Sequence, residues 1–220
     1  MEPVDLIRDA LLSRGVFVND EVIDRFRMYQ SCLLEWNRKT NLISKNDEPR
    51  IVTRHFLQSI GLLTVFDFPN ESRILDLGTG GGFPGLPMKI IRSDLDLVLV
   101  EATQKKAVFL EEIVRILNLK NAVTIPERVE SLNNKIQPAD IIISRAVADL
   151  KLLVRWGKAC LKKEGGHLIA IKGKRVNQEI QQLKADSRVH NTISCNVLPY
   201  NPFPEIFALH DSCVVVIKIV

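Results

Sequence analysis

The residues best suited to chemistry lie in one short stretch, DLGTGGGFPGLP, which runs from Asp76 to Pro87. It holds five glycines and two prolines in twelve residues, between the apolar runs RIL and MKII. Glycine permits backbone conformations and close approaches that other residues forbid, so a loop this rich in glycine makes room for a bound molecule. A strand before the loop and a helix after it would place that molecule at the carboxyl edge of an open α/β sheet. We therefore expect a ligand site here.

Features missing from the loop narrow the choice of ligand. A Walker-type phosphate loop ends in Gly-Lys-Ser or Gly-Lys-Thr, but this loop holds no lysine before Lys89. The dinucleotide fingerprint requires glycine at its first, third and sixth positions; counted from Gly78, the third is Gly80 but the sixth is Phe83. The two prolines also lack the N–H groups that a pyrophosphate needs. A nucleoside without phosphates, such as S-adenosylmethionine, fits these residues better.

Two acidic residues beyond the loop support a nucleoside. Glu101 ends the next apolar run, about twenty residues on, where this architecture places an acid against the ribose hydroxyls. An alternative reading makes Glu101 a cap for a helix that begins near Thr103. Further along, PERVESL offers Val129 and Glu130 to the adenine edge. The alternative for Glu130 is an acid in the first turn of a helix.

Short apolar runs alternate with helical patterns after residue 72, and these are the elements that must position the loop. We expect strands at RILDLG, DLVLVE, AVTIP, ADIIIS, HLIAIKG, ISCNVLPY and SCVVVIKIV. Helices are expected near 84–92, 104–117 and 149–161. This alternation predicts an α/β fold with a doubly wound, mostly parallel sheet. The last two strands follow one another without an obvious helix, so we expect one of them to run antiparallel.

The N-terminal third reads as helical. Apolar residues recur there at steps of three and four, which is the stripe of an amphipathic helix beginning near Asn19 or Asp20. The stripe consists of Val22, Ile23, Phe26, Tyr29, Leu33 and Trp36. A second helix is expected from about Pro49 to Phe66. Residues 1–70 would then form a helical cap on an α/β domain of residues 71–220, together one compact unit.

Composition restricts the class of protein. At 220 residues with 46% apolar content, the chain can bury a sizeable core. It holds no run of roughly 20 apolar residues and has acids where a secretion signal carries bases, so we expect a cytoplasmic protein without a membrane partner. The cysteines lie too far apart for a zinc site or a disulfide framework, and we expect reduced thiols and no metal. They are Cys32, Cys160, Cys195 and Cys213.

The mild net charge of +4 is unevenly distributed. From Arg145 to Arg175 the chain carries nine basic and two acidic residues. This local excess favours a polyanionic partner. The alternative is a solvated helix face followed by a loop.

Several segments of the sequence resemble those of a known family. The segments DLGTGGGFPGLP, EATQKKAVFL, ERVESL and ISRAVADL are similar to those of the bacterial small-subunit ribosomal RNA guanine-N7 methyltransferases, formerly called glucose-inhibited division protein B. LLEWNRKTNLIS and RHFLQSI add support upstream. The resemblance covers about Leu33 to Lys172, and its Gly-Phe-Pro-Gly and Ser-Arg-Ala segments are quite specific.

The resemblance implies a Rossmann-like, seven-stranded methyltransferase domain under an N-terminal helical extension. It implies S-adenosylmethionine as methyl donor, with Gly78, Gly80 and Phe83 at the donor pocket. It also assigns further residues to the ribose, to the adenine and to the matched pocket. These are Glu101, Ala102 and Thr103 for the ribose, Val129 and Glu130 for the adenine, and Arg145 for the pocket. For Arg145 a buried structural ion pair is the alternative.

The implied acceptor is N7 of a guanine in 16S ribosomal RNA, free or within the small ribosomal subunit. This nitrogen carries a free lone pair, so no general base is needed and positioning is the main task. No catalytic residue is therefore assigned. Arg145, Arg54, His55 and Lys172 are candidates for positioning the RNA. The alternatives are an interface histidine for His55 and an ordinary strand-end lysine for Lys172. We expect a monomer.

Two other functions stay open on the sequence alone. One is a methyltransferase that acts on a small molecule or a protein, and the other is a noncatalytic RNA-binding or assembly factor. Donor binding separates the second from any enzyme. Mapping of the methylated product separates the enzymes from each other.

Overall fold

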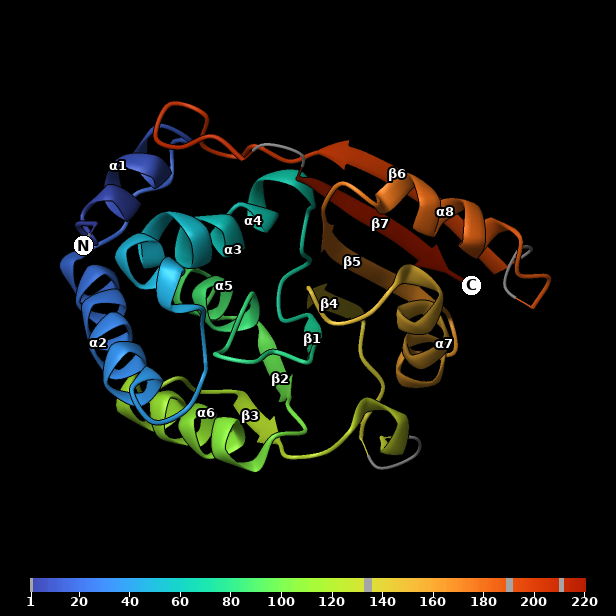
Figure 1. Cartoon of the computed structure of the whole chain (residues 1–220), viewed down its shortest axis with the longest axis horizontal. Coiled ribbons are helices and arrows are strands. Elements are labelled where there is room, and N and C mark those ends of the chain that lie inside the picture. The colour runs from blue at the N-terminus through green and yellow to red at the C-terminus, as the bar shows by residue number, and fades with distance from the viewer. Residues whose placement is uncertain (1, 133–135, 189–191, 210–211) are drawn as a thin grey trace.

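Seven strands within the described residues form a single twisted sheet, which runs through the middle of the molecule (Figure 1). The structure is a computed structural model that describes residues 2–132, 136–188, 192–209 and 212–220. The strand order is β3-β2-β1-β4-β5-β7-β6, and β7 runs antiparallel to both of its neighbours. The bounds are β1 Arg73–Leu77, β2 Asp96–Val100, β3 Ala122–Ile125, β4 Ile141–Arg145, β5 Gly166–Lys172, β6 Ile193–Pro199 and β7 Cys213–Ile219. The predicted fold class is confirmed.

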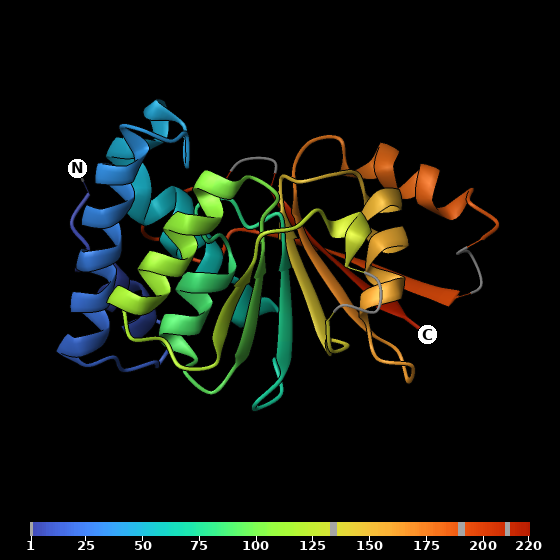
Figure 2. The same ribbon diagram turned by 90° about the horizontal axis from the view of Figure 1, so that it is seen from below.

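Helices cover both faces of this sheet, as Figure 2 shows from the side. The helices α5 and α6 lie on one face, and α7 and α8 lie on the other. The N-terminal helices pack outside α5 and α6. The helices are α1 Leu6–Leu12, α2 Asp20–Asn37, η1 Lys45–Arg50 (3₁₀), η2 Val52–Leu57 (π), α3 Gln58–Ile60, α4 Leu62–Val65, α5 Gly85–Ile91, α6 Gln104–Ile116, η3 Val129–Ser131 (3₁₀), α7 Leu150–Cys160 and α8 Val176–Lys184.

Burial on both faces explains why the strands read as unbroken apolar runs. In β2, for example, Leu97 and Leu99 belong to the hydrophobic cluster under α5 and α6, while Val98 and Val100 belong to the cluster under α7. Successive strand residues point to opposite faces, so both sets must be apolar. Because strands β1 to β5 pair in parallel, their carboxyl ends meet at one edge of the sheet.

The N-terminal helix α2 begins as its sequence predicts. The Asn19 side chain accepts a hydrogen bond from the Val22 amide at 3.1 Å, which makes Asn19 the N-cap. The apolar stripe faces inward, with Phe26 and Tyr29 fully buried. The hydrophobic cluster under α5 and α6 contains these residues together with side chains of the sheet. Residues before and after position 70 therefore share one core. The division into a cap and a domain stays a prediction.

The expected helix from Pro49 to Phe66 is wrong as a single element. The segment is helical, but it is a series of short 3₁₀, π and α pieces. Gly61 separates the last two, and a Cβ at this position would lie 2.4 Å from Cγ of Pro202 and 2.7 Å from the Tyr200 hydroxyl. The C-terminal segment thus packs onto the helix backbone where it breaks.

Candidate functional site

The glycine loop connects β1 to α5 at the point where the strand order reverses between β1 and β4. In open α/β sheets this reversal leaves a crevice at the carboxyl edge. Gly78, Gly80 and Gly82 have φ values of +63°, +61° and +96°, which side chains rarely permit. A Cβ on Gly78 would lie 2.7 Å from Val147, whereas the nearest heavy atom to one on Gly80 is 4.0 Å away. The loop is therefore open at Gly80 and covered at Gly78.

Asp76, on β1, holds the glycine loop in place through hydrogen bonds. Its Oδ2 accepts hydrogen bonds from the Thr79 hydroxyl at 2.6 Å and from the Gly85 amide at 2.8 Å. The carboxyl is fully buried, and burial raises its pKa to about 7. Among the described residues no group donates to its Oδ1. Sequence reasoning gave Asp76 no role, although it opens the motif.

Glu101 lies beside the loop at the end of β2. Its Oε2 accepts a hydrogen bond from the Gly80 amide at 3.0 Å, and its Oε1 accepts one from the Thr103 amide at 2.8 Å. The second bond is the helix-capping contact considered as an alternative. A carboxylate offers about four acceptor positions, so capping leaves acceptor capacity for a ligand. Ala102 and Thr103 follow on the surface.

The turn after β3 ends at the same edge of the sheet. Val129 is buried within the second hydrophobic cluster, while Glu130 is exposed. Both lie in the 3₁₀ turn η3. The sequence-predicted ligand residues from β1, β2 and β3 thus share one edge.

Phe83 faces the N-terminal helices. Its ring stacks on Tyr29 with centroids 5.6 Å apart, and it lies 4.7 Å from the ring of His55. The Tyr29 hydroxyl donates a hydrogen bond to the carbonyl of Gly81 at 2.5 Å. These contacts hold the loop against α2 and η2. The ring is buried among aromatic side chains, and the backbone of Phe83 forms part of the loop.

Arg145, the last residue of β4, joins the sheet to the N-terminal helices. Its Nη1 donates to the Arg54 carbonyl and to the Gln58 side-chain oxygen, both at 3.1 Å, and its Nη2 lies 2.7 Å from Nδ1 of His55. The guanidinium also lies 5.1 Å from the centroid of the Phe83 ring. Within the described residues it forms no ion pair, so the structural ion pair considered as an alternative is absent there.

His55 is uncharged at neutral pH. Burial, with the nearby positive charges of Arg145 and Arg54, lowers its pKa to about 3. Since Arg145 donates to Nδ1, the ring proton lies on Nε2, which points toward Asp47 with 3.9 Å between Nε2 and Oδ2. His55 is thus an interface histidine that accepts from Arg145, which matches its alternative reading. The Arg54 side chain is exposed.

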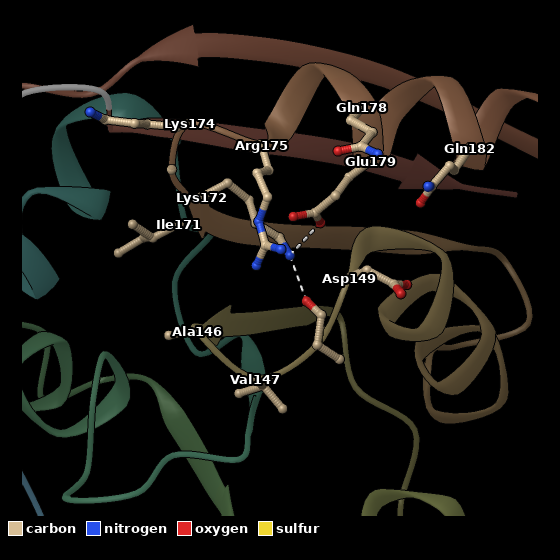
Figure 3. Close-up of a pocket in the computed structure, with 12 residues that line it drawn as sticks. Ala146, Val147, Asp149, Ile171, Lys172, Lys174, Arg175, Gln178, Glu179 and Gln182 are labelled. Atoms are coloured by element: carbon tan, nitrogen blue, oxygen red, sulfur yellow. Dashed lines mark hydrogen bonds and ion pairs between the residues drawn. The ribbon is translucent and has the colours of Figure 1, made fainter.

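Lys172, at the end of β5, is bonded internally. Its side chain is 8% exposed, and its Nζ donates to Glu179 Oε2 at 2.7 Å and to the Ala148 carbonyl at 2.5 Å (Figure 3). The same Glu179 oxygen accepts from the Leu150 amide at 3.0 Å. Lys172 therefore ties the loop between β4 and α7 to helix α8. The sequence gave no signal for Glu179.

Two cavities open at the ends of β4 and β5. One, of about 370 Å³, is lined by Arg54 and His55 of η2, Gln58 of α3 and Arg145 of β4, among others. The other, of about 680 Å³, lies between the β4–α7 loop and α8 (Figure 3). Their lining residues overlap. The shared residues are Ala146, Ile171, Lys172 and Gly173.

The basic run from Arg145 to Arg175 does not form one face. Arg145 and Arg175 lie at the carboxyl edge of the sheet. Arg155 lines a separate cavity on α7, and Lys162 pairs with Asp140 at the opposite edge, with 2.5 Å between Nζ and Oδ1. Only part of the run can therefore meet a polyanion at the candidate site.

Comparisons with known proteins identify the class. A structure of a SAM-dependent methyltransferase from Aquifex aeolicus superposes with a TM-score of 0.57, at 19% identity, over 80% of this chain and 96% of that one. The plantazolicin methyltransferase BpumL in complex with SAH superposes with a TM-score of 0.58, at 12% identity, over 87% and 95%. The fold is that of the S-adenosylmethionine-dependent methyltransferases, and together with the match to a methyltransferase family model over residues 22–201 it confirms the predicted donor.

The family follows from the sequence. Residues 22–201 match the family model described as rRNA small subunit methyltransferase G, and the chain belongs to this family. The ribosomal RNA small subunit methyltransferase G of Roseiflexus castenholzii is 40% identical over 180 residues, which cover 80% of this chain and 75% of that protein. The family named from the residues is thereby confirmed. No helix of the described residues is long and apolar enough to cross a membrane.

Proposed function

We propose that this protein transfers the methyl group of S-adenosylmethionine to N7 of a guanine in 16S ribosomal RNA. The observation that carries the proposal is that Glu101, at the end of β2, lies against the open glycine loop that follows β1 and accepts a hydrogen bond from the Gly80 amide. It supports a site for a nucleoside without phosphates, and family membership supports ribosomal RNA as the class of acceptor.

On the donor side, the backbone at Gly80 provides the close approach, and Glu101 accepts hydrogen bonds from the ribose hydroxyls. Ala102 and Thr103 border the ribose, while Val129 and Glu130 border the adenine. The sulfonium of the donor supplies an electrophilic methyl group when it is bound. The loop is rigid before the donor arrives, because Asp76 and Tyr29 already hold its backbone.

On the acceptor side, the protein has to orient a base that is already nucleophilic. Arg145 and Arg54 border the smaller cavity, and Arg145 also contacts Phe83 of the glycine loop. Arg145 is held in place by three neutral acceptors, so its orientation is fixed before RNA binds. Positioning of this kind is worth roughly 7 kcal/mol or more in model reactions.

The test is to incubate the protein with methyl-labelled donor and either small ribosomal subunits or naked 16S RNA, and then to map the label. The proposal predicts 7-methylguanosine at one position of the RNA. Label on another atom or on protein would contradict it. Donor binding without methyl transfer to either RNA substrate would identify a noncatalytic factor instead.

A further inference from the structure

The larger cavity at the candidate site has two distinct walls. Figure 3 shows the loop from Ala146 to Asp149 on one side and the start of α8 on the other, with Ile171 and Lys172 between them. Its volume of about 680 Å³ is enough for a nucleotide. We call this cavity the α8 groove.

The α8 groove adjoins the glycine loop. Val147 lines the groove, and the same side chain covers Gly78, where an added Cβ would lie 2.7 Å from it. The neighbouring Ala146 has φ of +57°, a left-handed conformation that costs about 1–3 kcal/mol outside glycine. A strained turn therefore presents Val147 as a wall between the groove and the loop.

Some side chains that face the groove already bond to other protein groups, and others are free to bond a ligand. Lys172 and Glu179 bond to each other, and Asp149 caps α7 by accepting from the Leu152 amide at 2.9 Å. The Arg175 side chain, by contrast, is exposed, and its guanidinium has no ion-pair or hydrogen-bond partner within the described residues. Gln178 and Gln182 are exposed on the same face of α8, one turn apart.

The available groups match the chemistry of an unpaired nucleotide. A guanidinium binds phosphate, and a carboxamide offers both a donor and an acceptor to the edge of a base. Single-stranded RNA is recognised by such contacts when its bases are splayed out. An acidic peptide would use the cation but would leave the two amides without a specific partner.

We propose that the α8 groove binds the nucleotide next to the target base, with Arg175 at its phosphate and with Gln178 and Gln182 at its base edge. This inference rests on the proposed function and deepens it. It makes α8 the element that reads sequence beside the methylated position.

The main test compares two double variants of the same helix. Gln178→Ala with Gln182→Ala removes the groove amides, while Asn177→Ala with Gln181→Ala removes exposed amides at the adjacent positions, outside the groove lining. We would measure kcat/KM with native RNA and with RNA changed at each nucleotide flanking the methylated one. S-adenosylhomocysteine affinity would be measured in parallel.

The groove variant should lose roughly tenfold or more in kcat/KM on native RNA and should no longer distinguish the altered flanks. The control variant should stay within about twofold of the unaltered protein. Equal losses in both variants, or retained discrimination in the groove variant, would overturn the inference. If the unaltered protein methylates no RNA, the proposed function itself fails, and that outcome is visible before any variant is made.

A second measurement isolates the phosphate contact. Arg175→Ala should lower RNA affinity and reduce the slope of log affinity against log salt concentration by about one. Lys184→Ala, an exposed base at the other end of α8, is the control and should leave the slope unchanged. The same slope in both variants would show that Arg175 does not contact an RNA phosphate.

Discussion

The two halves of the carboxyl edge differ in how their polar groups are used. At the ends of β1 and β2, Asp76 and Glu101 bond to the backbone of the glycine loop, and so does Tyr29 from helix α2. At the end of β5 and the start of α8, Arg175 and Gln178 face an open groove. Under the proposed function, the first half is preformed for the donor nucleoside, and the second half keeps polar groups available for the larger acceptor.

The largest effect is expected from the preformed half. Gly82→Ala should lower the free energy of unfolding by roughly 3 kcal/mol, because φ is +96° and the added Cβ would lie 2.5 Å from the Tyr29 hydroxyl. Gly80→Ala, at an open position with φ of +61°, should cost only about 1 kcal/mol. Urea unfolding measures both. Equal losses would show that packing around the loop is loose.

The next largest effect is expected on kcat, from a change at Arg145, which lies between the two halves. Arg145→Lys keeps the charge but loses the fork that contacts Arg54, His55 and Gln58. We expect kcat to fall roughly tenfold to 100-fold, with S-adenosylhomocysteine affinity changed less. Arg155→Lys, on α7, is the control and should behave as the unaltered protein. Unchanged kcat in Arg145→Lys would show that the fork does not position the acceptor.

Another effect of the preformed half is expected in the pH dependence of stability. The pKa of Asp76 is raised from 3.8 to about 7 in the folded state, so the folded protein binds this proton more tightly than the unfolded chain. The resulting stability is fully present below about pH 4 and is lost as the pH rises through 7. Relative to Asp76→Asn, the unaltered protein should lose roughly 3 kcal/mol of stability between pH 4 and 7, at about 1.4 kcal/mol for each unit of pKa shift.

The comparison with Asp76→Asn is needed because His55 acts in the opposite direction. Its folded pKa of about 3 lies below the ordinary 6.5, so its contribution to stability grows as the pH rises through this range. The effect of His55 cancels when two proteins that both contain it are subtracted. A flat difference between pH 4 and 7 would mean that the Asp76 carboxyl is ionised throughout.

The smallest effect is expected at the opposite edge of the sheet. Lys162 pairs there with Asp140 and lies far from the candidate site in the fold. Both side chains are partly exposed, so the pair is worth at most about 1 kcal/mol. Lys162→Ala should leave RNA affinity within about twofold. A loss comparable with that of Arg175→Ala would extend the RNA surface around the molecule.

The parts that sequence predicted are those fixed by local pattern. The strands and the loop follow from apolar runs and glycine spacing, and the N-cap at Asn19 follows from a single side chain. The break at Gly61 could not be predicted, because Tyr200 and Pro202 reach it from a distant segment. Helix α8 was missed because it is only nine residues long and mostly polar.

Within the candidate site the same division holds. Gly80 and Glu101 were recognisable because their spacing along the chain reflects one local unit. The bonding of Lys172 to Glu179 and the low pKa of His55 depend on packing between separate elements, which no local pattern encodes. Among the residues expected to hold RNA, the bonding partners of His55 and Lys172 were therefore the features that the sequence could least predict.

The contrast between the two halves is tested most directly by determining the structure of the protein with S-adenosylhomocysteine. The ligand should lie over Gly80 with its ribose hydroxyls on Glu101, and the α8 groove should remain open. A ligand seated in the α8 groove, or a loop that accepts a dinucleotide instead, would contradict the account.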